Sequence, residues 1–189
     1  MEQEINLTLT TDVLKEETNP FDFANPPYDP EKLFKAMSAF MSENNGVGIA
    51  ANQVGIPYSV FILGDPNTPE DHFAAFNPKI VDYGDELVYA DEGCLSYPGL
   101  WVKVKRPAEI RARFTTWDGT QDTMRLGGFS ARVFQHEYDH LFGITYHKRA
   151  NRIHLSKAQK DLKLLNRRRK RSKDSSLLKH SASSTVGGS

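Results

Sequence analysis

Two histidines, His136 and His140, stand four residues apart in the segment Gln-His-Glu-Tyr-Asp-His at 135–140. Helical geometry places residues i and i+4 on one face, so both imidazoles can hold one metal ion. Glu137 follows the first histidine, and its carboxylate can take a proton from an attacking water and return it to a leaving group. The spacing therefore predicts a hydrolytic metal centre on a helix. Chance coincidence of these residues is the alternative.

A catalytic site of this kind needs a third protein ligand, and the downstream sequence does not supply one. A metzincin would have a third histidine where this chain has Tyr146, and His147 comes one residue too late. A thermolysin-like enzyme would use a later glutamate, but no Glu follows Glu137. Beyond His140, the only carboxylates are Asp161 and Asp174, which lie in a basic stretch. The remaining candidates lie upstream.

Cys94 is the only cysteine of the chain, so it cannot form an internal disulfide. It lies in the segment Glu-Gly-Cys-Leu-Ser at 92–96, where the flanking Gly93 permits close backbone approach. One thiolate and two imidazoles make a ligand set that suits zinc or ferrous iron. We therefore expect Cys94 to be the third ligand. The alternative is a small buried hydrophobic residue, which is the usual role of a lone cysteine.

A third motif, Gly-Val-Gly-Ile-Ala-Ala-Asn-Gln at 46–53, has the letters of a degenerate dinucleotide fingerprint. That fingerprint joins a strand to a following helix. Here the order is reversed, because a predicted helix precedes the motif and a predicted strand follows it. We expect instead that the glycines let another backbone approach, such as a bound peptide, and that Gln53 offers a neutral amide donor. An ordinary tight turn is the alternative.

Periodicity and turn residues predict the elements that would position these side chains. Apolar residues at helical spacing predict a helix over 29–43, and the metal-binding helix should cover 130–141. Strands are predicted at 58–63, 72–81, 86–90, 102–117 and 120–126, with turns at Gly84 and Asp118-Gly119. The expected fold class is α+β, with antiparallel sheets packed around a central metal-binding helix that carries the HExxH sequence.

The three motifs, in this order, resemble the peptide deformylase family over roughly residues 5–165. The resemblance implies that the chain removes the formyl group from N-terminal formylmethionine of nascent polypeptides and releases formate. It implies one divalent metal ion held by Cys94, His136 and His140. Fe²⁺ is the ion that the resemblance favours, and Zn²⁺, Ni²⁺ and Co²⁺ are alternatives. Glu137 would carry the proton, while the Gln53 side chain and the Leu95 backbone N–H would stabilise the carbonyl oxygen.

The resemblance also implies a substrate pocket. Val47, Phe129 and Val133 would line a slot for the methionine side chain. Gly48, Gly93 and Gly99 would lie beside the peptide, and Glu92 and Arg106 would form an ion pair that steadies the cysteine segment. Phe129 and Val133 lie on the same predicted helical stripe as His136, so the apolar wall should end at the metal. Both could instead be ordinary core residues.

Charge is distributed unevenly along a chain whose formal net charge is zero. Residues 1–147 hold 11 Lys+Arg and 22 Asp+Glu, while residues 148–189 hold the other 13 and 2. We expect a catalytic domain over 1–166 and a basic, disordered tail over 167–189. The run at 167–171 could bind ribosomal RNA, because clustered cations attract polyanions, or could be an unspecific solvated tail.

Length and composition predict one small enzyme that is not a membrane protein. At 189 residues and 39% hydrophobic, the chain can bury one core, and it has no apolar run long enough to span a bilayer. No secretory signal is recognisable, and the single thiol must stay reduced, so we expect a cytoplasmic location. Two other functions stay open: a metallopeptidase, and a non-catalytic ribosome- or RNA-binding module with a structural metal.

Overall fold

The computed structural model describes residues 5–183, with side chains described to residue 171. Within this described part, seven strands form two antiparallel sheets. The larger sheet has the order β1-β2-β3-β6-β7: β1 (Gly48–Ala50), β2 (Val60–Leu63), β3 (Phe73–Tyr83), β6 (Glu109–Thr115) and β7 (Gln121–Gly127). The smaller sheet pairs β4 (Leu87–Cys94) with β5 (Tyr97–Pro107). The helices are α1 (Pro30–Glu43), α2 (Gly128–Leu141), α3 (Tyr146–Arg149) and α4 (Arg152–Ser183), with short 3-10 turns at Ala51–Val54 and Pro69–Asp71. The α+β class expected from the sequence is confirmed.

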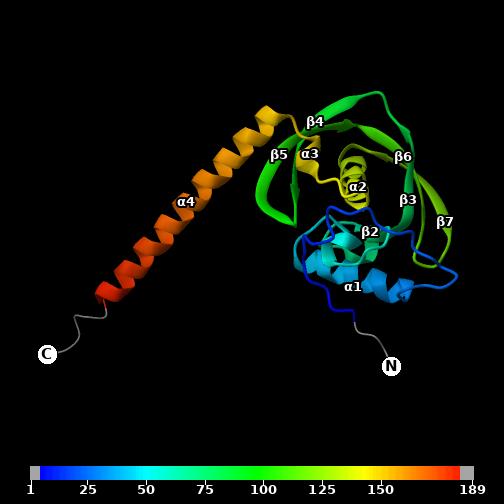
Figure 1. Ribbon diagram of the computed structural model, residues 1–189, viewed down its shortest axis with the longest axis horizontal. Coiled ribbons are helices and arrows are strands. Elements are labelled where there is room, and N and C mark those ends of the chain that lie inside the picture. Colours follow the sequence, from blue (N-terminus) through cyan, green and yellow to red (C-terminus); the bar gives the residue numbers. More distant parts are fainter. Residues whose placement is uncertain (1–4, 184–189) are drawn as a thin grey trace.

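Helix α2 lies at the centre of the molecule, between the two sheets (Figure 1). Its residues 131–137 are all buried, and Phe134 packs edge-on against Phe61 of β2. Strand β6 faces this core with Ile110, Ala112 and Phe114, which alternate with exposed residues as the pleat requires. Helix α1 begins at a cap in which the Lys32 N–H donates to Asp29 Oδ1 at 2.9 Å. It covers the end of the larger sheet (Figure 1).

The predicted single strand over 102–117 is wrong, because the chain changes sheets within it. Strand β5 ends at Pro107 and belongs to the smaller sheet, while β6 begins at Glu109 in the larger one. Proline has no N–H to continue a ladder, and the next N–H, that of Ala108, bonds to the Glu86 carbonyl. Strand β4 also runs past the predicted end at 90, so Cys94 is its last residue.

Helix α4 projects from the body of the molecule (Figure 1). It runs without interruption over Arg152–Ser183, so residues 167–183, which the sequence placed in the basic tail, have a helical backbone. The physical reason is composition, since residues 152–183 contain no Gly or Pro and many good helix formers. The predicted boundary between 166 and 167 falls inside this helix, and residues 184–189 lie outside the described part. Over residues 5–183, no helix has the length and apolar character that crossing a membrane requires.

Candidate metal centre and active site

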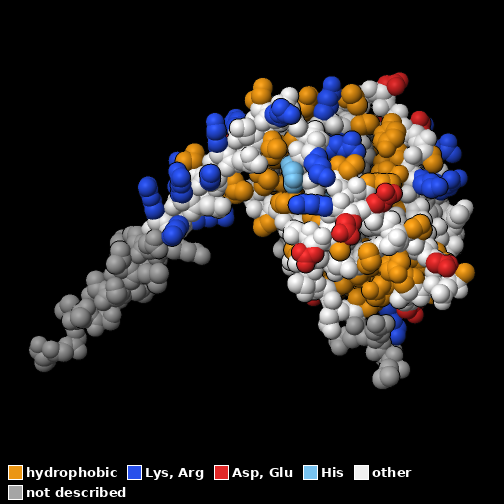
Figure 2. Space-filling view, in the orientation of Figure 1, with side chains coloured by type: hydrophobic (Ala, Val, Ile, Leu, Met, Phe, Trp, Pro, Cys, Tyr) orange, Lys and Arg blue, Asp and Glu red, His pale blue; other side chains and the backbone are white. Residues whose placement is uncertain are grey.

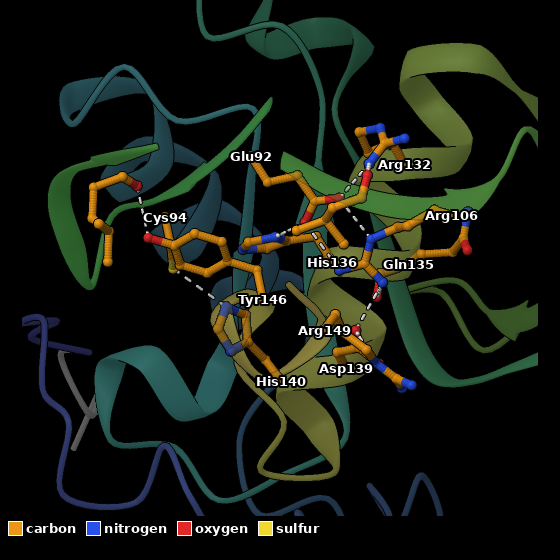
Figure 3. Close-up of polar contacts among 12 residues, drawn as sticks. Glu92, Cys94, Arg106, Arg132, Gln135, His136, Asp139, His140, Tyr146 and Arg149 are labelled. Atoms are coloured by element: carbon orange, nitrogen blue, oxygen red, sulfur yellow. Dashed lines mark hydrogen bonds and ion pairs between the residues drawn. The ribbon is translucent and has the colours of Figure 1, made fainter. Parts of the chain in front are cut away.

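Cys94, His136 and His140 converge at one point, although the cysteine comes from β4 and the histidines from α2 (Figure 3). Their ligand atoms all lie within 4.8 Å of one another, and Cys94 Sγ is 3.3 Å from His140 Nε2. Both histidines are buried and the cysteine is partly exposed. Burial lowers the pKa of His140 well below its usual value, which favours the neutral, metal-binding imidazole. This donor set fits a divalent zinc- or iron-type ion.

Glu92 orients the first histidine. Its Oε2 lies 3.0 Å from His136 Nδ1, and Arg106 donates to both of its oxygens, at 2.7 and 3.0 Å. Burial alone would raise the pKa of Glu92, but hydrogen bonds from His136 and Arg106 outweigh it and lower the pKa to about 2. An ionised carboxylate can only accept, so Nδ1 donates its proton to Glu92. Burial lowers the pKa of His136, but hydrogen bonds to Cys94 and Glu92 outweigh it and raise that pKa to about 10, so a metal ion would have to displace a proton from Nε2. The ion pair expected from the resemblance is present and is buried.

Three further charged residues belong to this cluster, and sequence reasoning missed all of them: Arg132, Asp139 and Arg149 (Figure 3). Arg132 donates to Glu92 Oε1 at 2.6 Å. Asp139 accepts from Arg106 at 2.8 Å and from Arg149 at 2.6 Å. The sequence held one signal for Arg132, which precedes His136 by four residues and so shares its helix face. Removing a buried partner such as Arg132 or Asp139 typically costs about 3–5 kcal/mol, whereas Arg149 is half exposed and contributes less.

Glu137 is buried beside the metal ligands and also lines the cleft described below. Its Oε2 has no hydrogen-bond partner within the described part of the chain. Burial raises the pKa of Glu137 to about 7. A carboxyl group with a pKa near neutrality is suited both to accept a proton and to release it again.

Gln53 presents its amide nitrogen to the same point. Its Oε1 accepts from the Ala50 N–H at 2.9 Å, which fixes the orientation of the amide. Its Nε2 is then 3.3 Å from Cys94 Sγ and 3.0 Å from Ser96 Oγ. The motif at 46–53 is therefore the edge strand β1 followed by a 3-10 turn, and it delivers a neutral donor to the metal ligands.

A cleft of about 400 Å³ opens onto the metal ligands and is lined mainly by apolar surface. Every residue that the resemblance placed at the substrate lines it, namely Val47, Gly48, Gly93, Gly99, Phe129 and Val133. Gln53, Leu95, His136 and Glu137 line it as well. Sequence reasoning missed Trp101, which is 64% exposed at the rim. Phe129 is 67% exposed and is thus no core residue, whereas Val133 is buried and serves both core and wall.

Gly48 has a neighbour that the sequence did not indicate. A Cβ atom at this position would lie 2.6 Å from Glu137 Oε1 and 2.9 Å from Val133 Cγ1. These separations are far below van der Waals contact, so any side chain would push the carboxylate away. The glycine leaves the room that the Glu137 carboxylate occupies.

We expect Gly48→Ala to lower kcat by about tenfold or more, because small displacements of a reacting group are costly, while the metal content stays unchanged. Steady-state kinetics with a formyl peptide and elemental analysis would measure the two effects. Gly127→Ala is the matched control, since a Cβ there meets nothing closer than 3.8 Å. Equal kcat in the two variants would show that Glu137 tolerates the displacement.

Comparisons with known proteins agree on one family. A sequence model described as "Polypeptide deformylase" matches residues 5–156. The peptide deformylase of Aquifex aeolicus is 38% identical over 160 residues, which cover 80% of this chain and 92% of that protein. Peptide deformylase 1B, chloroplastic/mitochondrial, of Arabidopsis thaliana is 34% identical over 140 residues, 73% of this chain. The matched segment spans about half of that plant protein, 51%.

Solved structures give the same result. The crystal structure of a plant peptide deformylase superposes with a TM-score of 0.77 at 29% identity, and the match covers 91% of this chain and 95% of that one. The family model alone matches well over half of the chain. The chain therefore belongs to the peptide deformylase family.

Proposed function

We propose that this chain is a metal-dependent hydrolase that removes the formyl group from N-terminal formylmethionine of nascent polypeptides and releases formate. One observation carries the proposal: in a chain of this family, Cys94, His136 and His140 converge at the end of an apolar cleft, with Glu137 beside them. The comparisons do not support the two other functions considered from the sequence, a metallopeptidase and a non-catalytic RNA-binding module.

The reaction requires a nucleophile, a proton carrier and stabilisation of the carbonyl oxygen. A divalent ion held by Cys94, His136 and His140 would supply Lewis acidity, which lowers the pKa of water and polarises a formyl carbonyl. Glu137 accepts the proton of the attacking water and passes it to the departing amine nitrogen. The Gln53 amide and the Leu95 backbone N–H donate to the carbonyl oxygen as charge builds on it. Removing one such donor typically costs about 2.7–4 kcal/mol.

Substrate binding uses the cleft and its free strand edge. Strand β1 is an edge of the larger sheet, so one side of its backbone is open to pair with an extended peptide. Gly48 lies on this strand, Gly93 lies on β4 and Gly99 on β5, and all three line the cleft. The methionine side chain enters the slot between Val47, Phe129 and Val133. Apolar pockets of this size bind a side chain mainly by removing its surface from water.

Formate release from formyl-Met-Ala-Ser, measured under anaerobic conditions together with elemental analysis of the same preparation, tests this function.

We propose Fe²⁺ as the native ion, with Zn²⁺, Ni²⁺ or Co²⁺ as alternatives. Ferrous iron and its thiolate ligand are sensitive to oxidation, so activity should decline in air. A preparation made in air, with full activity and only zinc bound, would contradict the iron assignment.

We place the enzyme in the cytoplasm, because Cys94 must stay reduced to act as a ligand.

The outer part of helix α4 is a further candidate for binding, in this case to ribosomal RNA. Lys and Arg side chains lie along its described length, while acidic side chains are scattered over the body (Figure 2). The five consecutive residues 167–171 are all Arg or Lys and all exposed. They have no interleaved aromatic side chains for base stacking, so binding would depend on phosphate contacts.

We expect truncation after Leu165 to leave hydrolysis of a short formyl peptide intact and to weaken co-sedimentation with ribosomes. If all five cations contact phosphates, affinity of the full-length chain should fall about 10²- to 10³-fold between 50 and 200 mM salt, because bound counterions are released. Sedimentation at both salt concentrations measures this. Equal ribosome binding by the truncated and full-length chains at low salt would show that the basic run only solubilises the protein.

A further inference from the structure

A second groove, of about 490 Å³, lies between strand β5 and helix α4. Gly99 and Trp101 line it from β5, and Leu162, Leu165, Asp161 and Arg168 are among the residues that line it from α4. Gly99 and Trp101 also line the cleft at the metal centre. The groove therefore adjoins that cleft, and Gly99 and Trp101 form the rim between the two.

The first turns of α4 are held firmly beside this rim. Leu155 and Ala158 pack against a cluster of Val102, Val104 and Tyr146. The Tyr146 hydroxyl donates to the Leu100 carbonyl at 2.7 Å, which links α3 to β5. Because the same strand carries Gly99 and Trp101, the wall formed by α4 has a fixed position relative to the metal ligands.

The groove is apolar in the middle and charged at its edges. Leu162 covers Gly99, with Cδ1 only 3.2 Å from where a Cβ atom of that glycine would be. Leu165 is 41% exposed and Trp101 is 64% exposed. The charged residues Asp161 and Arg168 lie beside them and are exposed. Exposed apolar groups gathered in a groove indicate a binding surface.

The substrate itself is the occupant that this geometry favours. A nascent chain whose first residue lies at the metal must leave the cleft, and an extended tripeptide reaches only about 10 Å. A chain that leaves over Gly99 and Trp101, the two residues that line both cavities, meets the groove next. Resting on the proposed function, we propose that the groove between β5 and α4 binds the nascent chain from about its fourth residue onward, in extended form and with a preference for apolar side chains.

The test compares peptide lengths. Three amidated, uncharged peptides are used: formyl-Met-Ala-Ser, the same peptide extended by Leu-Ala-Leu-Ala-Ser, and the extended peptide with serine at both leucine positions. The leucine octapeptide should show a kcat/KM at least about fivefold above that of the tripeptide, since burying a single leucine is worth more than this. The serine octapeptide should resemble the tripeptide.

Variants on one helix separate the groove from general effects. Leu165→Gln should lower kcat/KM for the leucine octapeptide about threefold or more and leave the tripeptide unchanged. Ile153→Gln is the matched control, because Ile153 is an exposed apolar residue of α4 outside the groove, and it should change neither. Glutamine leaves the net charge unchanged, and its helix propensity is no lower than that of leucine or isoleucine.

The outcomes distinguish this proposal from the function on which it rests. Turnover of the tripeptide with no gain from length, or equal effects of the two variants, would overturn the groove proposal and leave deformylation standing. If no peptide releases formate, both the groove proposal and the proposed deformylase function are wrong. Sedimentation velocity tests the remaining occupant, a second copy of the chain. The groove would be a contact between two copies if the full-length chain dimerises, Leu165→Gln makes it monomeric, and peptide length has no effect on kcat/KM. That result would show that the proposal is wrong.

Discussion

Replacing Glu137 with alanine is expected to lower kcat/KM for a formyl peptide by about 10²- to 10⁴-fold, the usual size of a general acid-base contribution. The three metal ligands remain, so the variant should keep its metal. Glu137 is buried beside those ligands. Two other carboxylates line the cleft: Asp91 is exposed to solvent, and Glu92 is held by His136 and two arginines. Formate release and elemental analysis of the same preparation would measure both effects.

Glu137→Gln is the control for side-chain volume. Glutamine fills nearly the same space next to Gly48 but cannot carry a proton, so its activity should be as low as that of the alanine variant. If either variant retains more than about a tenth of the activity, Glu137 is not the proton carrier, because acid-base catalysis is worth at least 10²-fold. Loss of metal in the glutamine variant would instead indicate a role in holding the ion.

Replacing Cys94 with serine is expected to weaken metal binding by more than about 100-fold, which is the upper range for changes in groups that only orient a ligand. A serine hydroxyl is a far poorer ligand than a thiolate for a borderline-soft ion. Cys94 Sγ is one of the three converging ligand atoms and lies 3.3 Å from His140 Nε2. Metal content after dialysis against a chelator, together with activity, would measure the loss.

Ser96→Ala is the matched control for this prediction. Ser96 lies two residues from Cys94 and accepts a hydrogen bond from Gln53, but it is outside the converging set. It should therefore keep stoichiometric metal. Tightly held, stoichiometric metal in purified Cys94→Ser would remove Cys94 from the ligands and reopen the search for the third one.

The buried charge cluster explains how ligands from two separate elements are held together. Glu92 on β4 orients His136 on α2, and Arg106 on β5 links Glu92 to Asp139 on α2. Arg132 adds a second link between α2 and Glu92. The smaller sheet and the metal-binding helix are thus joined by charged hydrogen bonds directly behind the ligands. Such supporting contacts hold the metal ligands in the orientation that metal binding requires.

The sequence alone predicted the features that depend on local geometry. The i, i+4 spacing of His136 and His140 places both on one helix face wherever that helix lies. Alternation and turn residues were enough for the α+β class and most strand positions. The resemblance carried by the three motifs added the pocket residues, and all of them line one cleft. The assignment of roles to these residues stays a prediction.

Only the tertiary structure decided the contacts between residues far apart in the chain. That Gly48 leaves room for Glu137, and that Arg132 and Asp139 belong to the cluster around Glu92, depends on how β1, β4 and α2 pack. The change of sheet after Pro107 likewise depends on which partner each half of the segment finds. The docking of Leu155 and Ala158 on β5 also fixes where helix α4 begins, and the helix propensity of the residues that follow continues it into the basic segment. Local spacing fixes which side chains share a face, whereas packing fixes what that face meets.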